Sequence, residues 1–294
     1  MSIEILIEPE ELEYQLSHSK CTVVDATVDF PAPNFDGDYR PASGLLHWEE
    51  SHIPSAHHVD LLHTLANLEA PYCFAYPSIS KFQNVLMSLG VASHRTLVVY
   101  DKGNGFWAAR LWWMLRSVGI NARVLNGGWK AWLQYGGAIE KGTTYKKLAP
   151  SHSLDLKENL NFWCDKEEIN KVRANPELGV IVCALSENVF KGQSFTRYTR
   201  RGHIPGSYNL PARSLLDDTG KYLTGIFLNQ ALGDWLYLRH THLCLYCGGG
   251  ISASSLALSL TLAGFTSLSI YDGSLQEWSA YPELPLETEN KHEQ

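Results

Sequence analysis

The chain has 294 residues, of which 45% are hydrophobic and 19% are charged, so it can form two ordinary domains or one large one. Its net charge of −7 argues against nucleic acid or an anionic membrane surface as a partner. No apolar run is long enough to cross a bilayer, and the first residues lack the basic and apolar regions of a secretory signal. The six cysteines are too few and too scattered for a disulfide framework, so we expect a cytoplasmic protein.

The first half of the chain alternates helices with short apolar strands. A polar segment with leucines at positions 12 and 16 predicts an amphipathic helix over residues 9–18. Several prolines and glycines predict an irregular stretch over residues 30–50. The other predicted elements are strands over 22–25, 97–101 and 122–125, a helix from Ser78 to Leu89, a helix ending at Gly119 and a short helix over 129–135.

The second half repeats this order. Asp165, with Glu168 three residues later, is typical of a capping box at the start of a helix. Strands follow over 180–183, 243–246 and 268–271, with helices over 229–238 and from the glycines near 250 to Gly264. We therefore predict an α/β protein of two tandem domains, each a mainly parallel sheet flanked by helices. The expected limits are residues 1–140 and 161–294, joined by a linker over 141–160.

One cysteine stands in a distinctive local pattern. The apolar strand over 243–246 ends at Cys247, and three glycines and a helix rich in Ser, Ala and Leu follow. Buried cysteines mostly behave as small hydrophobic residues. A glycine turn at a helix N-terminus, however, directs several N–H groups and the helix dipole at one point, where they stabilise an anion. The whole pattern favours a functional Cys247 that reacts as a thiolate.

The duplication provides an internal comparison for this position. Counting back from the glycines that end the paired helices, Gly264 and Gly119, Cys247 corresponds to Asp101 in the first copy. Only the second copy can carry out thiol chemistry here. We expect the first copy to act as scaffold, and its Trp48 and Trp107 are candidates for lining the cleft.

At these residues the sequence resembles the tandem-domain rhodanese family, which comprises thiosulfate and 3-mercaptopyruvate sulfurtransferases. The resemblance covers nearly the whole chain, roughly from Ile5 to Leu286. The matching features are His-Ile-Pro at 52–54, Gly-His-Ile-Pro-Gly at 202–206, Trp112-Trp113, Asn126-Gly127-Gly128, Asp272-Gly273 and the loop that opens at Cys247.

The resemblance implies a sulfurtransferase in which Cys247 carries a sulfane sulfur as a persulfide. The donor would be mercaptopyruvate, thiosulfate or a persulfide, and the acceptor a thiol or cyanide. A thiol-reductant protein is a further expected partner, and neither a cofactor nor a metal is expected. The N–H groups that would hold the persulfide belong to Gly248, Gly249, Gly250, Ile251 and Ser252.

The loop departs from both subfamilies. Thiosulfate-type loops carry basic residues after the cysteine, whereas this loop has Gly248 and Gly249. The mercaptopyruvate type opens Cys-Gly-Ser-Gly-Val-Thr, which is closer to the present Cys-Gly-Gly-Gly-Ile-Ser, but its serine is replaced by Gly249. The histidine and aspartate that act with that serine fall at Phe74 and Leu62, so we expect this relay to be absent.

The donor-binding arginines of the family are also only partly present. Val189 stands at the first of these positions, and the second falls at Arg197 after a gap of one residue. Arg200 and Arg201 lie close in sequence and are alternative contacts for an anionic donor. The identity of the donor therefore stays open.

Several other interpretations compete with the leading one. Cys244 and Cys247 form a Cys-x-x-Cys pattern, but a closed zinc site needs further ligands, and we expect Cys244 to pack in the core. A cysteine-dependent phosphatase would need an arginine at the end of the loop, where this chain has Ile251, Ser252 and Ala253. His52 and His203 are expected to tie loops to the backbone. The rival function is a sulfur-binding or regulatory rhodanese-like module without efficient turnover.

Overall fold

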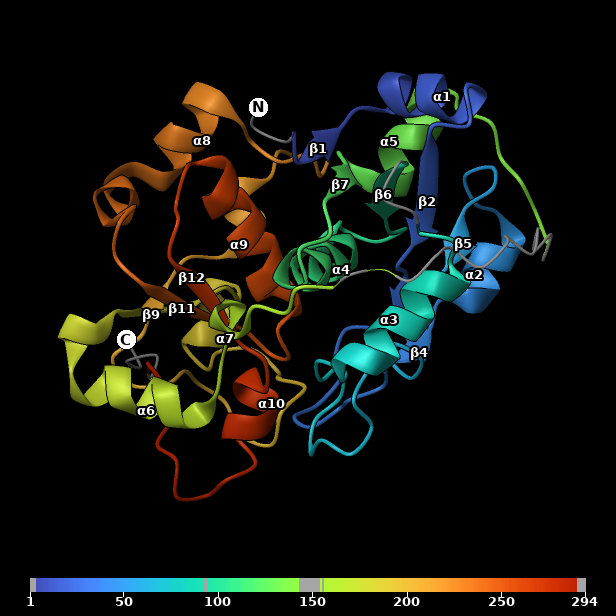
Figure 1. Ribbon diagram of the computed structural model, residues 1–294. Coiled ribbons are helices and arrows are strands. Elements are labelled where there is room, and N and C mark those ends of the chain that lie inside the picture. Colours follow the sequence, from blue (N-terminus) through green and yellow to red (C-terminus); the bar gives the residue numbers. More distant parts are fainter. Residues whose placement is uncertain (1–3, 92–94, 143–153, 155, 290–294) are drawn as a thin grey trace.

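Each half of the chain folds around its own five-stranded parallel sheet, as the computed structural model shows for residues 4–91, 95–142, 154 and 156–289 (Figure 1). The two sheets have the same strand order, which confirms the predicted duplication. In space the first sheet runs β1 (Leu6–Ile7), β7 (Ala122–Leu125), β6 (Thr96–Tyr100), β2 (Cys21–Asp25) and β5 (His57–His58). The second runs β8 (Trp163–Cys164), β12 (Leu268–Tyr271), β11 (Leu243–Tyr246), β9 (Val180–Cys183) and β10 (Tyr208–Asn209).

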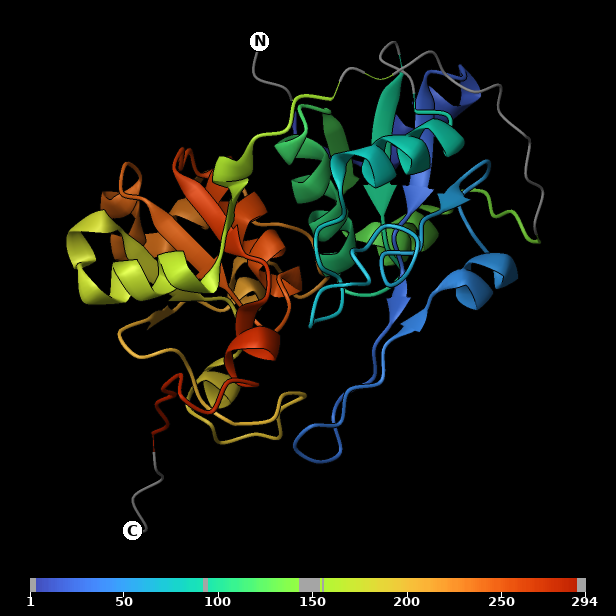
Figure 2. The same cartoon turned by 60° about the horizontal axis from the view of Figure 1, so that its bottom comes forward.

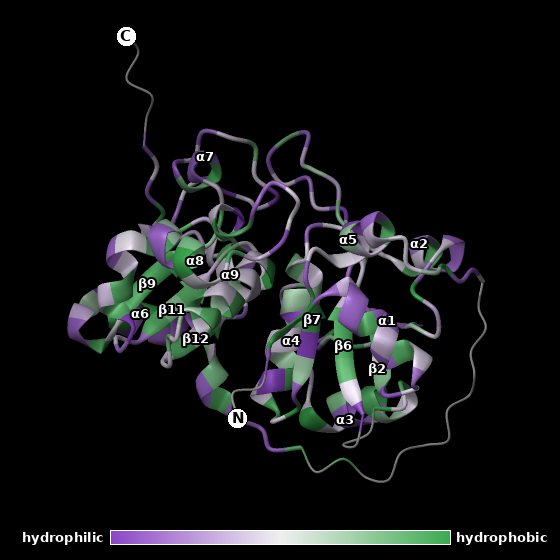
Figure 3. Cartoon of the chain, turned by 90° about the horizontal axis from the view of Figure 1, so that it is seen from above, coloured by the Kyte–Doolittle hydropathy of each residue, from purple (hydrophilic) through white to green (hydrophobic). Residues whose placement is uncertain are grey.

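Helices cover the faces of both sheets, as expected for parallel strands joined by crossovers (Figures 1 and 2). Hydrophobic residues concentrate in the central strands β6, β9, β11 and β12 (Figure 3). The helices of the first half are α1 (Pro9–Ser17), α2 (Leu45–Glu50), α3 (Ile79–Ser88), α4 (Phe106–Ser117) and α5 (Gly128–Tyr135). Those of the second half are α6 (Lys166–Ala174), α7 (Glu187–Phe190), α8 (Gly225–Leu232), α9 (Ile251–Leu262) and α10 (Ser274–Trp278).

Two corresponding helices, α4 and α9, pack against each other where the domains meet (Figure 1). Both are buried on nearly every side, from Trp107 to Leu115 in α4 and from Ala253 to Leu260 in α9. A helix that is apolar around its whole circumference needs partners on all faces. Each of these helices therefore packs on its own sheet and on the other domain, so the two domains share one core.

A pair of hydrogen bonds crosses the domain boundary at equivalent places. The Tyr76 N–H donates to Oδ2 of Asp272 over 2.8 Å, and the Tyr222 N–H donates to Oδ1 of Asn126 over 2.9 Å. Asn126 follows β7, and Asp272 follows β12, the corresponding strand. The two domains thus exchange equivalent contacts, and the first-domain loop over residues 30–40 also reaches the segment near Thr196 (Figure 2).

The two His-Ile-Pro motifs fasten loops to the backbone, as predicted. Nδ1 of His52 lies 2.8 Å from the carbonyl of Trp48, and Nδ1 of His203 lies 2.9 Å from that of Phe190. The isoleucine N–H that follows His203 donates to the hydroxyl of Tyr246, the last residue of β11, over 3.0 Å. This motif therefore anchors the strand end that carries Cys247.

Some local predictions need correction. The stretch over 30–50 is not wholly irregular, because it contains β4 (Ala42–Ser43), which pairs with β3 (Val28–Asp29), and helix α2. The helix expected over 229–238 begins earlier, at Gly225, and its second part is a 3₁₀ segment. The break occurs at Gly233, whose φ of +50° does not belong to an α-helix.

The predicted domain limits stay a prediction. Most of the expected linker, residues 143–153 and 155, lies outside the described residues, as do the two ends of the chain. None of the helices in the described part of the chain combines the length and the apolar character that a bilayer crossing demands.

Candidate active site at Cys247

Cys247 lies at the carboxyl end of the central strand β11, where open parallel sheets bind their ligands. The loop over 248–250 leads into α9, and Gly250 caps the helix with a φ of +80°, a conformation that favours glycine. The predicted order of strand, cysteine, glycine loop and helix is therefore present. Only 1% of Cys247 is exposed to solvent.

The first turn of α10 holds this loop from the side. The Cys247 N–H donates to Oγ of Ser274 over 3.1 Å, and its carbonyl accepts from the Leu275 N–H over 3.1 Å. The Gln276 N–H donates to the carbonyl of Gly248 over 2.8 Å. These bonds hold the loop against α10 through two carbonyls and the Cys247 N–H, and the N–H groups of residues 248–252 take no part in them.

Those N–H groups are available to a ligand. Among the residues that the structure describes, the backbone N–H groups of positions 248–252 donate no hydrogen bond to a protein acceptor. The last of these positions lie in the first turn of α9, where the helix itself offers no partner. The arrangement suits an anion placed at the start of the helix.

The corresponding loop in the first domain already holds an anionic group. The carboxylate of Asp101, the counterpart of Cys247, accepts hydrogen bonds from the N–H groups of Gly103, Gly105 and Ala108 over 2.8, 3.0 and 2.9 Å. Burial raises the pKa of this carboxyl, and the three N–H groups oppose the rise. The first copy thus shows how this loop type surrounds a side-chain acceptor at its first position.

Cys247 opens onto a cavity of about 190 Å³ between the domains. Its walls also include the loop residues Gly248, Gly249, Ile251 and Ser252, so the structure gathers most of the predicted site. Gly250 does not line it. The aromatic residues of the wall are Phe30, Tyr39, Phe74, Phe106, Trp107 and Tyr198. Of the two tryptophans considered for the cleft, Trp107 is present, whereas Trp48 is buried beside His52.

Tyr198 is a site residue that the sequence analysis missed. A Cβ atom at position 248 would overlap its hydroxyl, so the phenol lies directly against the glycine that follows Cys247. Burial, and then the charge of a Cys247 thiolate, raise the pKa of Tyr198 well above its ordinary value. The phenol therefore keeps its proton and can donate a hydrogen bond into the cavity. In the sequence, only the position of Tyr198 next to Arg197 indicates that it could belong to the site.

The three arginine candidates separate in the structure. Arg197 lines the cavity, and its Nη2 donates to the carbonyls of Pro31 and Phe30 over 2.8 and 3.3 Å. Its guanidinium also stacks 4.2 Å from the centre of the Phe30 ring. Of the three arginines predicted to bind the donor, Arg197 is therefore the one that lines the cavity.

Arg200 and Arg201 do not reach the cavity, which corrects their inclusion among the candidate site residues. Nε of Arg200 donates to the carbonyl of Ser279 over 2.9 Å, and Nη2 to that of Tyr281 over 2.8 Å. Nε of Arg201 lies 2.8 Å from the carboxylate of Asp36. Both side chains therefore bond to other protein groups and are absent from the cavity lining.

The positions expected for the histidine and aspartate of the Ser-His-Asp relay hold apolar side chains. Phe74, at the expected histidine position, is a wall residue with a φ of +62°. Leu62 is buried in the core shared by the domains. Among the described residues that line the cavity, there is no histidine and no carboxylate.

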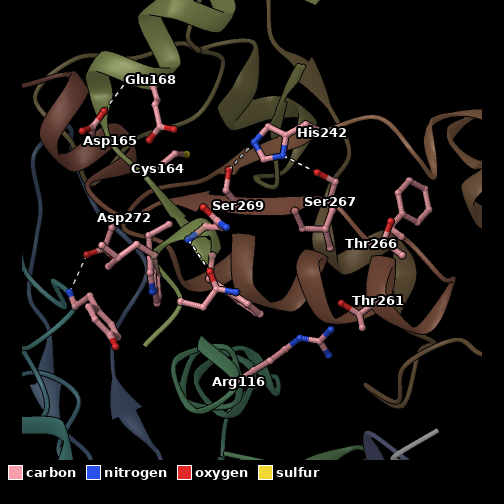
Figure 4. A pocket seen from close by; sticks show the side chains of 18 of the residues that line it. Arg116, Cys164, Asp165, Glu168, His242, Thr261, Thr266, Ser267, Ser269 and Asp272 are labelled. Carbon is pink, nitrogen blue, oxygen red and sulfur yellow. Dashed lines mark hydrogen bonds between the residues drawn. The ribbon is translucent and has the colours of Figure 1, made fainter. Parts of the chain in front are cut away.

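A larger cavity of about 950 Å³ lies elsewhere on the domain boundary (Figure 4). His242 projects into it, with its ring nitrogens 3.0 and 3.2 Å from the hydroxyls of Ser267 and Ser269. Cys244 packs beside it in the core, as predicted, and a hydrogen bond from the Cys164 thiol lowers its pKa. Within the described residues, no group of three or more His, Cys, Asp or Glu side chains could hold a metal ion.

Comparison with known proteins agrees with this geometry. The family model for the rhodanese-like domain matches residues 8–135 and 187–281. The 3-mercaptopyruvate sulfurtransferase of Escherichia coli K12 is 26% identical over 306 residues, covering 98% of this chain and 99% of the relative. The thiosulfate sulfurtransferase of Gallus gallus is 28% identical over 235 residues, covering 79% of each chain.

A solved structure gives the same result for the fold. The crystal structure of the Tum1 protein from Saccharomyces cerevisiae superposes with a TM-score of 0.82 at 25% identity, covering 99% of this chain and 100% of that one. The similarity therefore extends to the arrangement of both domains. With two matched domains, a shared strand order and relatives named sulfurtransferases along most of its length, the chain belongs to the rhodanese-like domain family.

Proposed function

We propose that this protein is a sulfurtransferase in which Cys247 takes a sulfane sulfur from a small donor and passes it to a thiophilic acceptor. The observation that carries the proposal is the buried thiol at the end of β11, set in a loop whose N–H groups have no acceptor in the described part of the chain. The sulfurtransferase relatives support the same reaction class.

In the first step the Cys247 thiolate attacks the transferable sulfur of the donor. A sulfur–sulfur bond forms to Cys247, and the bond between that sulfur and the rest of the donor breaks, with its electron pair leaving on the donor remnant. The terminal sulfur of the persulfide carries the negative charge. The N–H groups of residues 248–252 and the start of α9 are placed to stabilise that charge.

In the second step a thiol or cyanide acceptor attacks the terminal sulfur. The bond to Cys247 breaks, its electron pair returns to the cysteine, and the thiolate is regenerated. The hydroxyl of Tyr198, which lies against Gly248, is placed to donate a hydrogen bond to whichever sulfur bears the charge. No cofactor takes part in either step.

The cavity favours a donor of low charge over a dianion. Its walls are mostly aromatic, and Arg197 is the one cationic side chain among its described lining residues. Thiosulfate carries two charges on one compact group, whereas near neutral pH mercaptopyruvate carries one charge and a persulfide carries one on its reacting group. We therefore propose a persulfide or a mercaptopyruvate-like thiol as donor, with Arg197 meeting its charge.

A second candidate function is a rhodanese-like module that holds sulfur without efficient turnover. It is favoured by the low exposure of Cys247, the small cavity and the lack of a histidine or carboxylate among the described lining residues. Such a module would take up sulfur once and release it only to a dedicated partner, such as a thiol-reductant protein. The location of the protein in the cytoplasm stays a prediction for both candidate functions.

A donor panel distinguishes the two functions. Thiosulfate, mercaptopyruvate and glutathione persulfide are each supplied in excess with cyanide, and thiocyanate is measured over time for the wild type and Cys247→Ser. We expect many turnovers with mercaptopyruvate and glutathione persulfide, fewer with thiosulfate, and none in the variant. A single equivalent of product from every donor would support the non-turnover module instead.

A further inference from the structure

The first domain contributes a buried cation beneath the Cys247 loop. Arg110, on α4, is only 1% exposed. Its Nη2 donates to Oδ1 of Asp272 over 2.5 Å and to the carbonyl of Phe74 over 2.8 Å. Asp272 belongs to the second domain, so this ion pair crosses the domain boundary.

The rest of the guanidinium is directed at the active-site loop. A Cβ atom built on Gly250 would lie 2.7 Å from Nη1 of Arg110, so this nitrogen lies against the residue that caps α9. Nη1 and Nε are both buried and have no hydrogen-bond partner among the described residues. Buried guanidinium N–H groups without an acceptor are costly, which makes this arrangement unusual in a purely structural role.

The other half of the ion pair is connected to the same loop. Oδ2 of Asp272 accepts from the Tyr76 N–H over 2.8 Å and from the Tyr72 hydroxyl over 3.4 Å. Two residues later, Ser274 accepts the Cys247 N–H. First-domain groups therefore fix Asp272, and Asp272 begins the short segment that holds the catalytic loop.

The positions that correspond to Arg110 and Asp272 beside the first-domain loop carry no such ion pair. Arg110 is the fifth residue of α4, and the fifth residue of α9 is Ser255, whose Oγ lies 3.0 Å from the Tyr222 hydroxyl. The counterpart of Asp272 is the neutral Asn126. The loop on that side holds its own carboxylate, Asp101, and the charge pair is found only beneath the loop that would hold a persulfide.

We propose that Arg110 is a positioning residue for the Cys247 loop. Through Asp272, Arg110 fixes the turn. Its Nε and Nη1, which have no hydrogen-bond partner among the described residues, bring positive charge to the base of a loop that has no basic side chain of its own. The persulfide part of this inference rests on the proposed function, whereas the effect on the free thiolate does not.

Other titratable groups lie near the same place and could affect the reactivity of Cys247. Around Arg110 and Asp272 these are Tyr72 and, farther out, Glu277, while Trp163 stacks on the guanidinium. Around the thiol they are Cys183, Tyr198 and Arg197. Burial raises the pKa values of Tyr72, Tyr198 and Cys183, so these three stay neutral between pH 6 and 9.

The test measures Cys247 directly. The rate of alkylation by iodoacetamide is followed against pH in a Cys73→Ser, Cys244→Ser background, so that neither the partly exposed thiol nor the neighbouring one contributes. We expect Arg110→Met to raise the midpoint of this profile by about one pH unit and to slow sulfur uptake about tenfold. The midpoint and the uptake rate of Arg110→Lys should lie between those of the wild type and Arg110→Met. The lysine keeps the charge, but one ammonium group cannot both bond Asp272 and face Gly250.

Two further variants separate positioning from folding. Arg116→Met, on the exposed side of the same helix, should leave the pH profile of alkylation and the rate of sulfur uptake unchanged. If Arg110→Met does not fold, the double variant Arg110→Met with Asp272→Leu removes both charges and should restore the fold while the shifted profile persists.

An unshifted profile in a folded Arg110→Met protein, or in the double variant, would overturn the inference. A shifted profile in a protein whose wild type takes up no sulfur would instead contradict the proposed function and leave this inference standing.

Discussion

At the scale of single residues, Gly248 has the most restricted environment in the site. Any side chain at this position would collide with the Tyr198 hydroxyl, whereas a Cβ atom at Gly249 would meet its nearest neighbour at an ordinary 3.6 Å. Backbone freedom alone predicts glycines at both positions. The structure adds a second reason for Gly248, which is the close approach of a phenol.

We expect Gly248→Ala to destabilise the loop by about 1–3 kcal/mol, the usual cost of overpacking, and to slow turnover by at least tenfold. Gly249→Ala is the matched control and should retain most of its activity. Adding Tyr198→Ala to Gly248→Ala removes the hydroxyl and the ring, and should restore the melting temperature more than the activity. Equal behaviour of the two glycine variants would contradict the packing described for Tyr198.

Arg197 allows a prediction about the donor. We expect Arg197→Ala to raise KM for an anionic donor about ten- to a hundredfold, the effect of losing a charge-assisted contact of roughly 1.5–3 kcal/mol. An uncharged polysulfide-like donor should be affected little. Arg200→Ala serves as the control, because its side chain bonds to backbone carbonyls outside the cavity. A loss of donor affinity in Arg200→Ala alone would show that the site was assigned to the wrong arginine.

At the scale of elements, the sequence predicted the parts that depend on local pattern. The central strands, the glycine turns and the Asp165 cap follow from apolar runs, glycines and a capping residue, and all are present. Two-residue strands such as β1 and β10 were missed, because pairing with a neighbouring strand defines them more than their own composition does.

The same contrast applies to the site. Cys247 and its loop could be found because they form one continuous stretch of sequence. Arg110 is separated from its partner Asp272 by 162 positions, and Phe30 and Tyr39 reach the cavity only because the domains pack together. No local pattern in the sequence marks such residues.

Strand β9 provides a prediction about pH. Burial raises the pKa of its last residue, Cys183, to about 12, above the value near 8.5 of a free thiol. Because the folded state keeps this proton longer than the unfolded state, its stabilising effect is complete below about pH 8.5 and is lost as pH rises toward 12.

Between pH 8.5 and 10.5 we expect this group to remove about 2–3 kcal/mol from the free energy of unfolding. Urea unfolding at both pH values should show this loss in the wild type and a smaller loss in Cys183→Ala. Cys73→Ala, at a partly exposed thiol, is the control and should behave like the wild type. Identical losses in wild type and Cys183→Ala would contradict the burial of this thiol.

At the scale of the whole molecule, the packing of α4 on α9 makes the domains interdependent. Both helices are buried around nearly their whole surface, and residues of both domains share the largest core. The first copy, which has Asp101 in place of the cysteine, thus provides Arg110, much of the aromatic wall and one half of the shared core.

We therefore expect the two domains to unfold together in one transition. Tryptophan fluorescence and the alkylation of Cys183, which lies in the second domain, should report the same midpoint in urea. Two separated midpoints would show that the shared core contributes less to stability than its burial indicates.

The central claim is that Cys247 carries the transferred sulfur, and intact-mass measurement tests it most directly. The protein is incubated with an excess of glutathione persulfide, desalted and weighed, beside Cys247→Ser and Cys244→Ser. We expect one added sulfur atom in the wild type and in Cys244→Ser, lost again when cyanide is added, and no addition in Cys247→Ser. A cyanide-labile sulfur that persists in Cys247→Ser would contradict the claim.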